Sequence, residues 1–291
     1  MKLSYWIIGL FMVLLAIAFK SENTPKNSIK EAPLKTEKPK NLINKSGTTI
    51  KTRFNLPEGF QRVTVPQNSF ADYLQNLPLK PDGSKVQYYN GATKHAANVY
   101  AGVIDMDIGK RDLQQCADAI MRLRGEYLWQ QKAYDKIHFD FTNGFQVDYT
   151  QWMKGNRMRI EGNKTTWYPA KTPSNTYKDF RAYMNLIFAY AGTLSLSKEL
   201  PSIAFEDMQI GDIFIQGGSP GHAIIVVDMA KHQETGKQLF LLAQSYMPAQ
   251  DIQILQNPIN EAISPWYNQQ FTGNLVTPEW QFRKGDLKRF E

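Results

Sequence analysis

Residues 211–228 constrain the fold of this chain more than any other segment. They read Gly-Asp-Ile-Phe-Ile-Gln, then Gly-Gly-Ser-Pro-Gly, then His-Ala-Ile-Ile-Val-Val-Asp. Two apolar runs of strand length around a turn rich in Gly and Pro predict a β-hairpin. The second run has no polar residue between His222 and Asp228, which is typical of a fully buried strand. The segment therefore predicts a covered sheet, with His222 at the mouth of the turn.

His222 is a candidate general base. The head of a buried strand fixes an imidazole in orientation and removes part of its water, which brings its pKa near the working pH. A turn histidine on the surface is an equally good interpretation of the sequence alone.

The following strand, predicted over residues 238–245, turns from apolar to polar at Gln244. If it pairs antiparallel with the His222 strand through a turn centred near Glu234, then Gln244 and Ser245 lie near His222. Either side chain would then hydrogen-bond the imidazole and fix its tautomer. Alternatively, both residues only satisfy backbone groups at the end of a strand.

The chain has one cysteine, Cys116, which excludes an intramolecular disulfide. We predict it on a helix with Asp112 as N-cap. Apolar residues recur at helical spacing there: Leu113, Cys116, Ala117, Ile120, Leu123, Tyr127 and Leu128. This stripe places Cys116 toward the core, as a small hydrophobic residue. Its position near a helix N-terminus instead favours the thiolate, and predicts iodoacetamide labelling with a pKa below that of an ordinary thiol.

The net charge of +7 comes from the N-terminal part of the chain. Residues 20–53 hold nine Lys and Arg against three acidic residues, and Lys2 adds one more positive charge. Residues 54–291 are therefore neutral in sum. Because a nucleic-acid-binding domain needs a basic face, we expect no nucleic-acid partner.

Three segments follow from composition. Residues 1–20 contain an uncharged apolar run, which predicts a cleaved signal peptide or an N-terminal membrane anchor. Residues 21–53 are rich in Lys, Pro, Asn and Ser and predict a disordered basic linker. Residues 54–291 predict a single domain. We therefore expect an exported protein of the periplasm or cell envelope, in contact with a membrane only through its N-terminal segment.

Helices and strands alternate in the folded part without βαβ regularity, which predicts the α+β class. The expected helices follow Ser69 and cover 112–128 and 177–194. The expected strands cover 98–108, 137–142, 145–149, 157–161, 165–168, 211–215, 222–229, 238–245 and 276–282. No Cys/His group has zinc spacing, so we expect neither a metal nor a cofactor. Gly218, Ser245 and Trp266 are the residues we expect to contact a substrate, Trp266 by stacking on a sugar ring.

Four features follow one another in the chain: Cys116 at the start of a helix, Gly211–Ile215, Gly221–Val226 and the polar end of the next strand. This combination resembles the NlpC/P60 and CHAP branch of papain-like cysteine peptidases. The resemblance implies a papain-like core, a helix packed on an antiparallel sheet, with N-terminal and central additions; the central one would span residues 137–200. It also implies that Cys116 is the nucleophile, His222 the base and Gln244 the orienting residue, acting on peptidoglycan amide bonds.

Over residues 54–290 the chain more specifically resembles the DUF4846 family of exported bacterial proteins. The likeness rests on Leu77–Lys80, Gln115–Ala119, the Gly211–Asp228 block and Ala243–Gln250. That family carries no assigned activity. Two hypotheses follow: a cysteine hydrolase acting on an amide bond of cell-wall peptide or another envelope substrate, and a non-catalytic envelope protein on the same scaffold that binds glycan or a partner.

Overall fold

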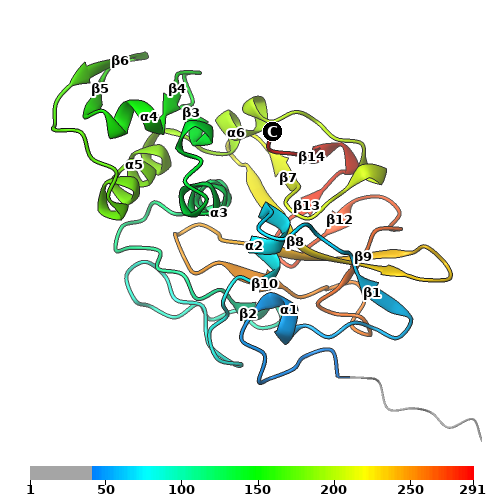
Figure 1. Ribbon diagram of the computed structural model, residues 1–291. Helices are drawn as coiled ribbons and strands as arrows, with labels where there is room; N and C mark the ends of the chain where they lie inside the picture. The colour runs from blue at the N-terminus through cyan, green and yellow to red at the C-terminus, as the bar shows by residue number, and fades with distance from the viewer. Residues whose placement is uncertain (1–40) are drawn as a thin grey trace, which may run out of the picture. The chain divides into compact units, whose positions relative to one another are not determined.

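The strand–turn–strand block lies inside an eight-stranded sheet of the computed structural model, which describes residues 41–291 (Figure 1). β7 (Ile213–Gln216) pairs antiparallel with β8 (His222–His232), so the predicted hairpin is confirmed. β9 (Gln238–Gln244) pairs antiparallel with the other edge of β8. The order of the sheet is β14 (Leu287–Lys288), β7, β8, β9, β10 (Gln253–Leu255) and β2 (Tyr100–Val103), and β1 (Phe60–Arg62) also pairs with β8 and β11 (Tyr267–Asn268) with β9. The mixed α+β class with an antiparallel sheet is therefore confirmed.

Three two-stranded sheets pair β3 (His138–Asp140) with β4 (Gln146–Asp148), β5 (Asn156–Glu161) with β6 (Lys164–Pro169), and β12 (Leu275–Val276) with β13 (Gln281–Phe282). The helices are α1 (Ile50–Arg53), α2 (Phe70–Gln75), α3 (Cys116–Gln130), α4 (Tyr149–Met153), α5 (Tyr177–Tyr190) and α6 (Thr193–Glu199).

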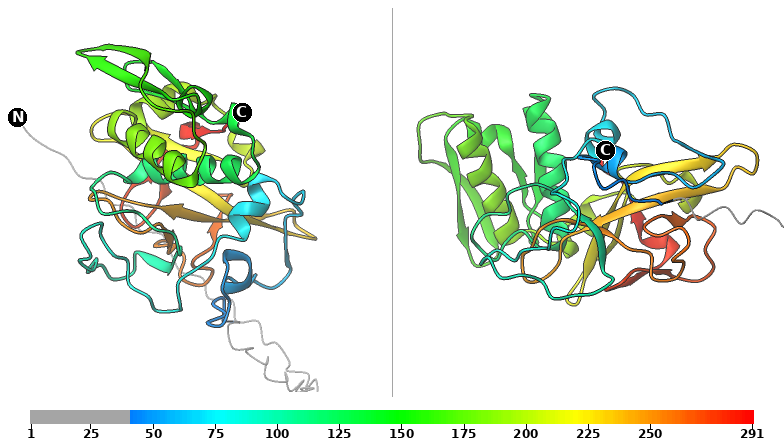
Figure 2. Two further views of the ribbon diagram at one scale, coloured as in Figure 1. Left: turned by 60° about the vertical axis from the view of Figure 1, so that its left-hand side comes forward. Right: turned by 90° about the horizontal axis from the view of Figure 1, so that it is seen from below.

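Both faces of β8 are covered, which explains its unbroken apolar run. Ala223, Ile225 and Val227 belong to a core that also contains the buried side chains of α3, α5 and α6. Ile224 and Val226 belong to a second core with residues of β11, β12, β13 and β14. Figure 2 shows the helices of residues 116–199 on one side of the sheet and the C-terminal segment on the other.

The helix that carries Cys116 packs on α5 through a glycine. A side chain at Gly125 would approach Met184 Sδ to 3.1 Å and Phe180 to 3.3 Å, so the two helices meet closely only because this position has none. The helix starts later than the sequence predicted: Gln115, not Asp112, occupies its N-cap, and Cys116 is its first residue.

Two other sequence predictions were wrong in detail. The strand expected over 276–282 is a hairpin, β12 and β13, because Thr277 and Trp280 close a tight turn with a backbone hydrogen bond of 2.9 Å. The helix expected over 177–194 ends at Tyr190, and the residues that follow form a further helix, α6, in which Leu196 is fully buried.

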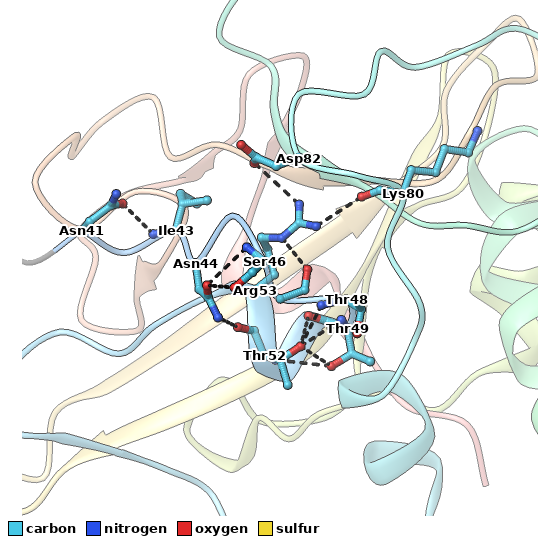
Figure 3. A network of polar contacts seen from close by, with 11 residues as sticks. Asn41, Ile43, Asn44, Ser46, Thr48, Thr49, Thr52, Arg53, Lys80 and Asp82 are labelled. Atoms are coloured by element: carbon cyan, nitrogen blue, oxygen red, sulfur yellow. Dashed lines mark hydrogen bonds and ion pairs between the residues drawn. The ribbon is translucent and has the colours of Figure 1, made fainter.

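The folded body begins before Phe54, so the predicted linker boundary was wrong. Arg53 is buried, and its guanidinium donates to the carbonyls of Gly47 at 2.8 Å and Lys80 at 3.3 Å (Figure 3). Ile50 is also fully buried, and Thr49 caps the single turn of α1. A linker-like average composition concealed these few anchoring residues.

Residues 41–291 form one compact unit. The signal peptide or anchor predicted for residues 1–20, and residues 21–40 of the predicted linker, lie outside the described residues. Within the described part of the chain, we find no helix with the length and apolarity needed to cross a membrane.

Candidate functional site

A cavity of about 820 Å³ lies where the start of α3 meets the mouth of the β7–β8 hairpin. Cys116 and His222 both line it, although they are 106 positions apart in the chain. They share this cavity because α3 packs against β8 (Figure 1), and each residue is the first of its element. The rest of the wall comes from α6 and its approach, the glycine-rich turn, Tyr246, Met247 and Trp280.

Cys116 is half-buried at the start of α3. Burial raises the pKa of its thiol to about 11, although the backbone amide of Ala117 and that of Ala223 favour the thiolate. The negative charge of Asp118 adds to the increase. The lowered pKa expected from the helix N-terminus is therefore not found, because loss of water outweighs the effect of the amides.

His222 is 2% exposed and surrounded by aromatic rings. Its ring centroid lies 4.8 Å from that of Tyr246 and 5.4 Å from that of Trp280. The Trp280 indole is held there by a hydrogen bond of 3.0 Å to Gln216, the residue opposite His222 in the hairpin. Burial lowers the pKa of His222 to about 4, so the imidazole is neutral at physiological pH.

Gln244 is the hydrogen-bond partner of His222, with 2.9 Å between Gln244 Oε1 and His222 Nε2. The contact expected from the strand register is thus present. A further polar residue follows: Gln244 Nε2 donates to Glu279 Oε2 at 2.7 Å. Lys94 Nζ lies 2.7 Å from both carboxylate oxygens of Glu279 and 5.5 Å from the centroid of the Tyr246 ring.

Gly218, which we expected to contact a substrate, lies in the cavity wall, within the turn between β7 and β8. Its φ of 143° is a conformation that glycine adopts readily, so the backbone requires this residue whether or not a substrate does. Packing requires a glycine at position 221, since the Cβ atom of any other residue would lie 2.5 Å from Thr193 Oγ1. The turn is thus held tightly against the start of α6.

Two of the expected substrate contacts were wrong. Trp266 is fully buried in the core, and its indole nitrogen donates to the carbonyl of Asn55 at 2.8 Å, so it cannot stack on a sugar. Ser245 is also fully buried and donates to the carbonyls of Gln114 and Gln250. Both residues hold the scaffold together instead of facing the cavity.

Sequence reasoning missed Glu279 and Lys94. Glu279 lies 35 positions after Gln244, and Lys94 lies in a loop before β2. Neither belongs to a motif or periodic pattern, so no local signal marks them. Asp118 was missed too: its carboxyl accepts from the backbone amide of Gln115, and burial raises its pKa well above the usual range.

The described residues contain no group of three or more His, Cys, Asp or Glu side chains placed to hold a metal ion. The polar side chains that line the cavity carry a thiol, an imidazole, hydroxyls, an amide and carboxyls. These can support nucleophilic attack and proton transfer.

Comparison with known proteins places the chain in a family without an assigned activity. Residues 50–289 match the family described as "Domain of unknown function (4846)", DUF4846, and the chain belongs to that family. No curated protein and no solved structure matches the chain.

Proposed function

We propose that this member of the DUF4846 family is a cysteine hydrolase with a papain-like core that cleaves an amide bond, with Cys116 as nucleophile, His222 as base and Gln244 as orienting residue. The observation that carries the proposal is that the only thiol of the chain and a buried, hydrogen-bonded imidazole line one cavity. A nucleophile, a base and a group that orients the base are the parts that covalent amide hydrolysis requires.

The reaction proceeds in two steps. Cys116 Sγ attacks the carbonyl carbon while its proton passes to His222 Nδ1, the ring nitrogen that Gln244 does not engage. The C–N bond then breaks, the amine leaves with the proton from Nδ1, and a thioester remains on Cys116. Water, deprotonated by Nδ1, hydrolyses the thioester to the carboxylic acid and restores the thiol.

The first backbone amides of α3 are suited to stabilise the negative oxygen of the tetrahedral intermediate. The first N–H groups of a helix have no intrahelical partner, and the amide of Ala117 already lies close enough to the sulfur to lower the pKa of Cys116. A donor in such a position is worth about 3–4 kcal/mol in transition-state stabilisation.

Thiol and imidazole rest in their neutral forms in this site. Burial raises the pKa of Cys116 and lowers that of His222, so both shifts oppose an ion pair. The base therefore removes the proton during the attack, and the pair becomes charged only as the reaction proceeds.

The substrate we propose is a cell-wall peptide or another amide of the envelope, and the site of action is outside the cytoplasm. The support is the apolar run within residues 1–20, the basic composition of residues 20–53 and the zero net charge of residues 54–291. Export would bring the cavity into contact with such amides.

Incubation of the full chain with purified peptidoglycan tests this function, with new amine ends measured by mass spectrometry. Cys116→Ala and His222→Ala should abolish their release, whereas His95→Ala, which replaces an exposed histidine, should leave it unchanged. Undiminished release by Cys116→Ala would contradict the proposed nucleophile.

The second candidate, a non-catalytic envelope-binding protein, is favoured by the half-buried thiol with its raised pKa. On this hypothesis, the wild type and Cys116→Ala should sediment with cell-wall material to the same extent, and neither should release new amine ends. Release that depends on Cys116 would exclude it.

A further inference from the structure

The turn between β12 and β13 brings a fourth polar residue to the site. Glu279 is fixed in this turn, where Thr277 and Trp280 are joined by a backbone hydrogen bond of 2.9 Å and by bonds of the Thr277 hydroxyl to both polar backbone atoms of Trp280. From there its carboxylate reaches Gln244 and Lys94, each at 2.7 Å. Lys94 is buried, so Glu279 meets a fixed cation and not a mobile surface lysine.

We infer that Glu279 is a positioning residue that orients the side-chain amide of Gln244 and thereby determines which ring nitrogen of His222 carries the proton. A carboxylate accepts hydrogen bonds and cannot donate them. The end of the Gln244 amide that faces Glu279 must therefore be its NH2 group, and the end that faces His222 must be its oxygen.

An amide oxygen accepts only, so His222 Nε2 must be the protonated nitrogen. Nδ1 then keeps its lone pair and serves as the acceptor for the proton of Cys116. If the Gln244 amide were reversed, Nε2 would have to accept and Nδ1 would carry the proton, which would leave no base for the thiol. This consequence for catalysis rests on the proposed function, but the tautomer does not.

Lys94 has a different part in this arrangement. It holds the carboxylate by an ion pair and makes no hydrogen bond with Gln244, so it is not needed for the choice between the two amide orientations. A substitution of either Lys94 or Glu279 breaks the same ion pair. Only the loss of Glu279, however, removes the acceptor that selects one orientation of the Gln244 amide.

The test reads the tautomer directly. The full chain is labelled with ¹⁵N-histidine, and long-range ¹H–¹⁵N correlation spectra at neutral pH identify the protonated nitrogen of His222, assigned by loss of its signals in His222→Ala. In the wild type, the Nε2–H tautomer should outnumber the Nδ1–H tautomer at least about tenfold. The reason is that a hydrogen bond to a charged group contributes more free energy than a tenfold ratio of populations requires. Lys94→Met and the exposed control Glu261→Gln should keep this tautomer.

Glu279→Gln should reduce the excess at least about tenfold, because a glutamine can donate as well as accept and so allows both orientations of Gln244. If that variant does not fold, Gln244→Met replaces it: the Lys94–Glu279 pair remains, and the Nε2–H preference should fall in the same way. An Nδ1–H tautomer in wild type, or an unchanged excess in a folded Glu279→Gln or Gln244→Met protein, would overturn the inference. No substrate is needed, so failure of the hydrolase proposal would leave this result intact, and the Cys116→Ala assay is independent of it.

Discussion

Alkylation of Cys116 by iodoacetamide is expected to be slow at neutral pH and to accelerate as pH rises. Only the thiolate reacts, and burial raises the pKa of this thiol from 9.0 to about 11. Below the lower value, the thiolate fraction is thus about 100-fold smaller than that of an ordinary thiol. The more basic thiolate is intrinsically more nucleophilic, so its own rate constant is roughly eightfold higher for a Brønsted slope near 0.45. The net expectation is labelling roughly ten times slower than that of a small-molecule thiol, before any steric protection.

The assay is convenient because the chain has a single cysteine. Labelling rates of native protein, of protein unfolded in urea and of N-acetylcysteine amide are measured by mass spectrometry across a pH series. The native rate should rise about tenfold per pH unit without a plateau below roughly pH 10, while the unfolded protein should follow the small thiol. His222→Ala should change the native rate little, because a neutral imidazole does not stabilise a thiolate.

A plateau of fast labelling between roughly pH 5 and 9 would refute this reasoning, since it would mean a thiolate–imidazolium pair at rest. A large loss of rate in His222→Ala would point the same way. Labelling that occurs only after unfolding would identify Cys116 as a purely structural residue.

Three further predictions concern stability, each measured by urea denaturation. Trp266→Ala should lower the free energy of unfolding by about 3–5 kcal/mol, because the indole is fully buried and its hydrogen bond to Asn55 is lost. A change below about 1 kcal/mol would contradict the place of this tryptophan in the core. Ile50→Ala should lower the free energy of unfolding by about 2–5 kcal/mol, whereas Lys51→Ala, at the exposed neighbouring position, should change it by less than about 0.5 kcal/mol. Equal, small effects of the two substitutions would mean that the segment before residue 54 is a linker. Burial raises the pKa of Glu199 from 4.5 to about 7, so the folded state binds its proton more tightly and should lose about 3 kcal/mol of stability as pH rises between these values. Glu199→Gln should remove that loss, and an equal slope in both proteins would argue against it.

The central hairpin and the long helices could be predicted because their signals are local. The apolar run after His222 and the Gly/Pro turn before it act over a few residues, and so does the stripe on α5. The contact between His222 and Gln244 could be predicted as well, since a short antiparallel connection fixes which residues of β8 and β9 lie opposite each other.

Other features could not be read from such patterns. A tryptophan can serve equally well to stack on a sugar or to fill a core, and only the packing around Trp266 decides that it is buried. The start of the folded body depended likewise on where Ile50 and Arg53 find partners, which average composition does not record.

The α+β class and the buried strand headed by His222 follow from the local sequence, because strand length, turn residues and apolar periodicity are properties of neighbouring residues. Three features depend instead on how distant elements pack: Cys116 shares a cavity with that histidine, its thiol is desolvated, and Glu279 and Lys94 complete the polar chain behind Gln244. These residues come from elements far apart in the chain, and their contacts exist only once the helices and the C-terminal hairpins have packed on the two faces of the sheet.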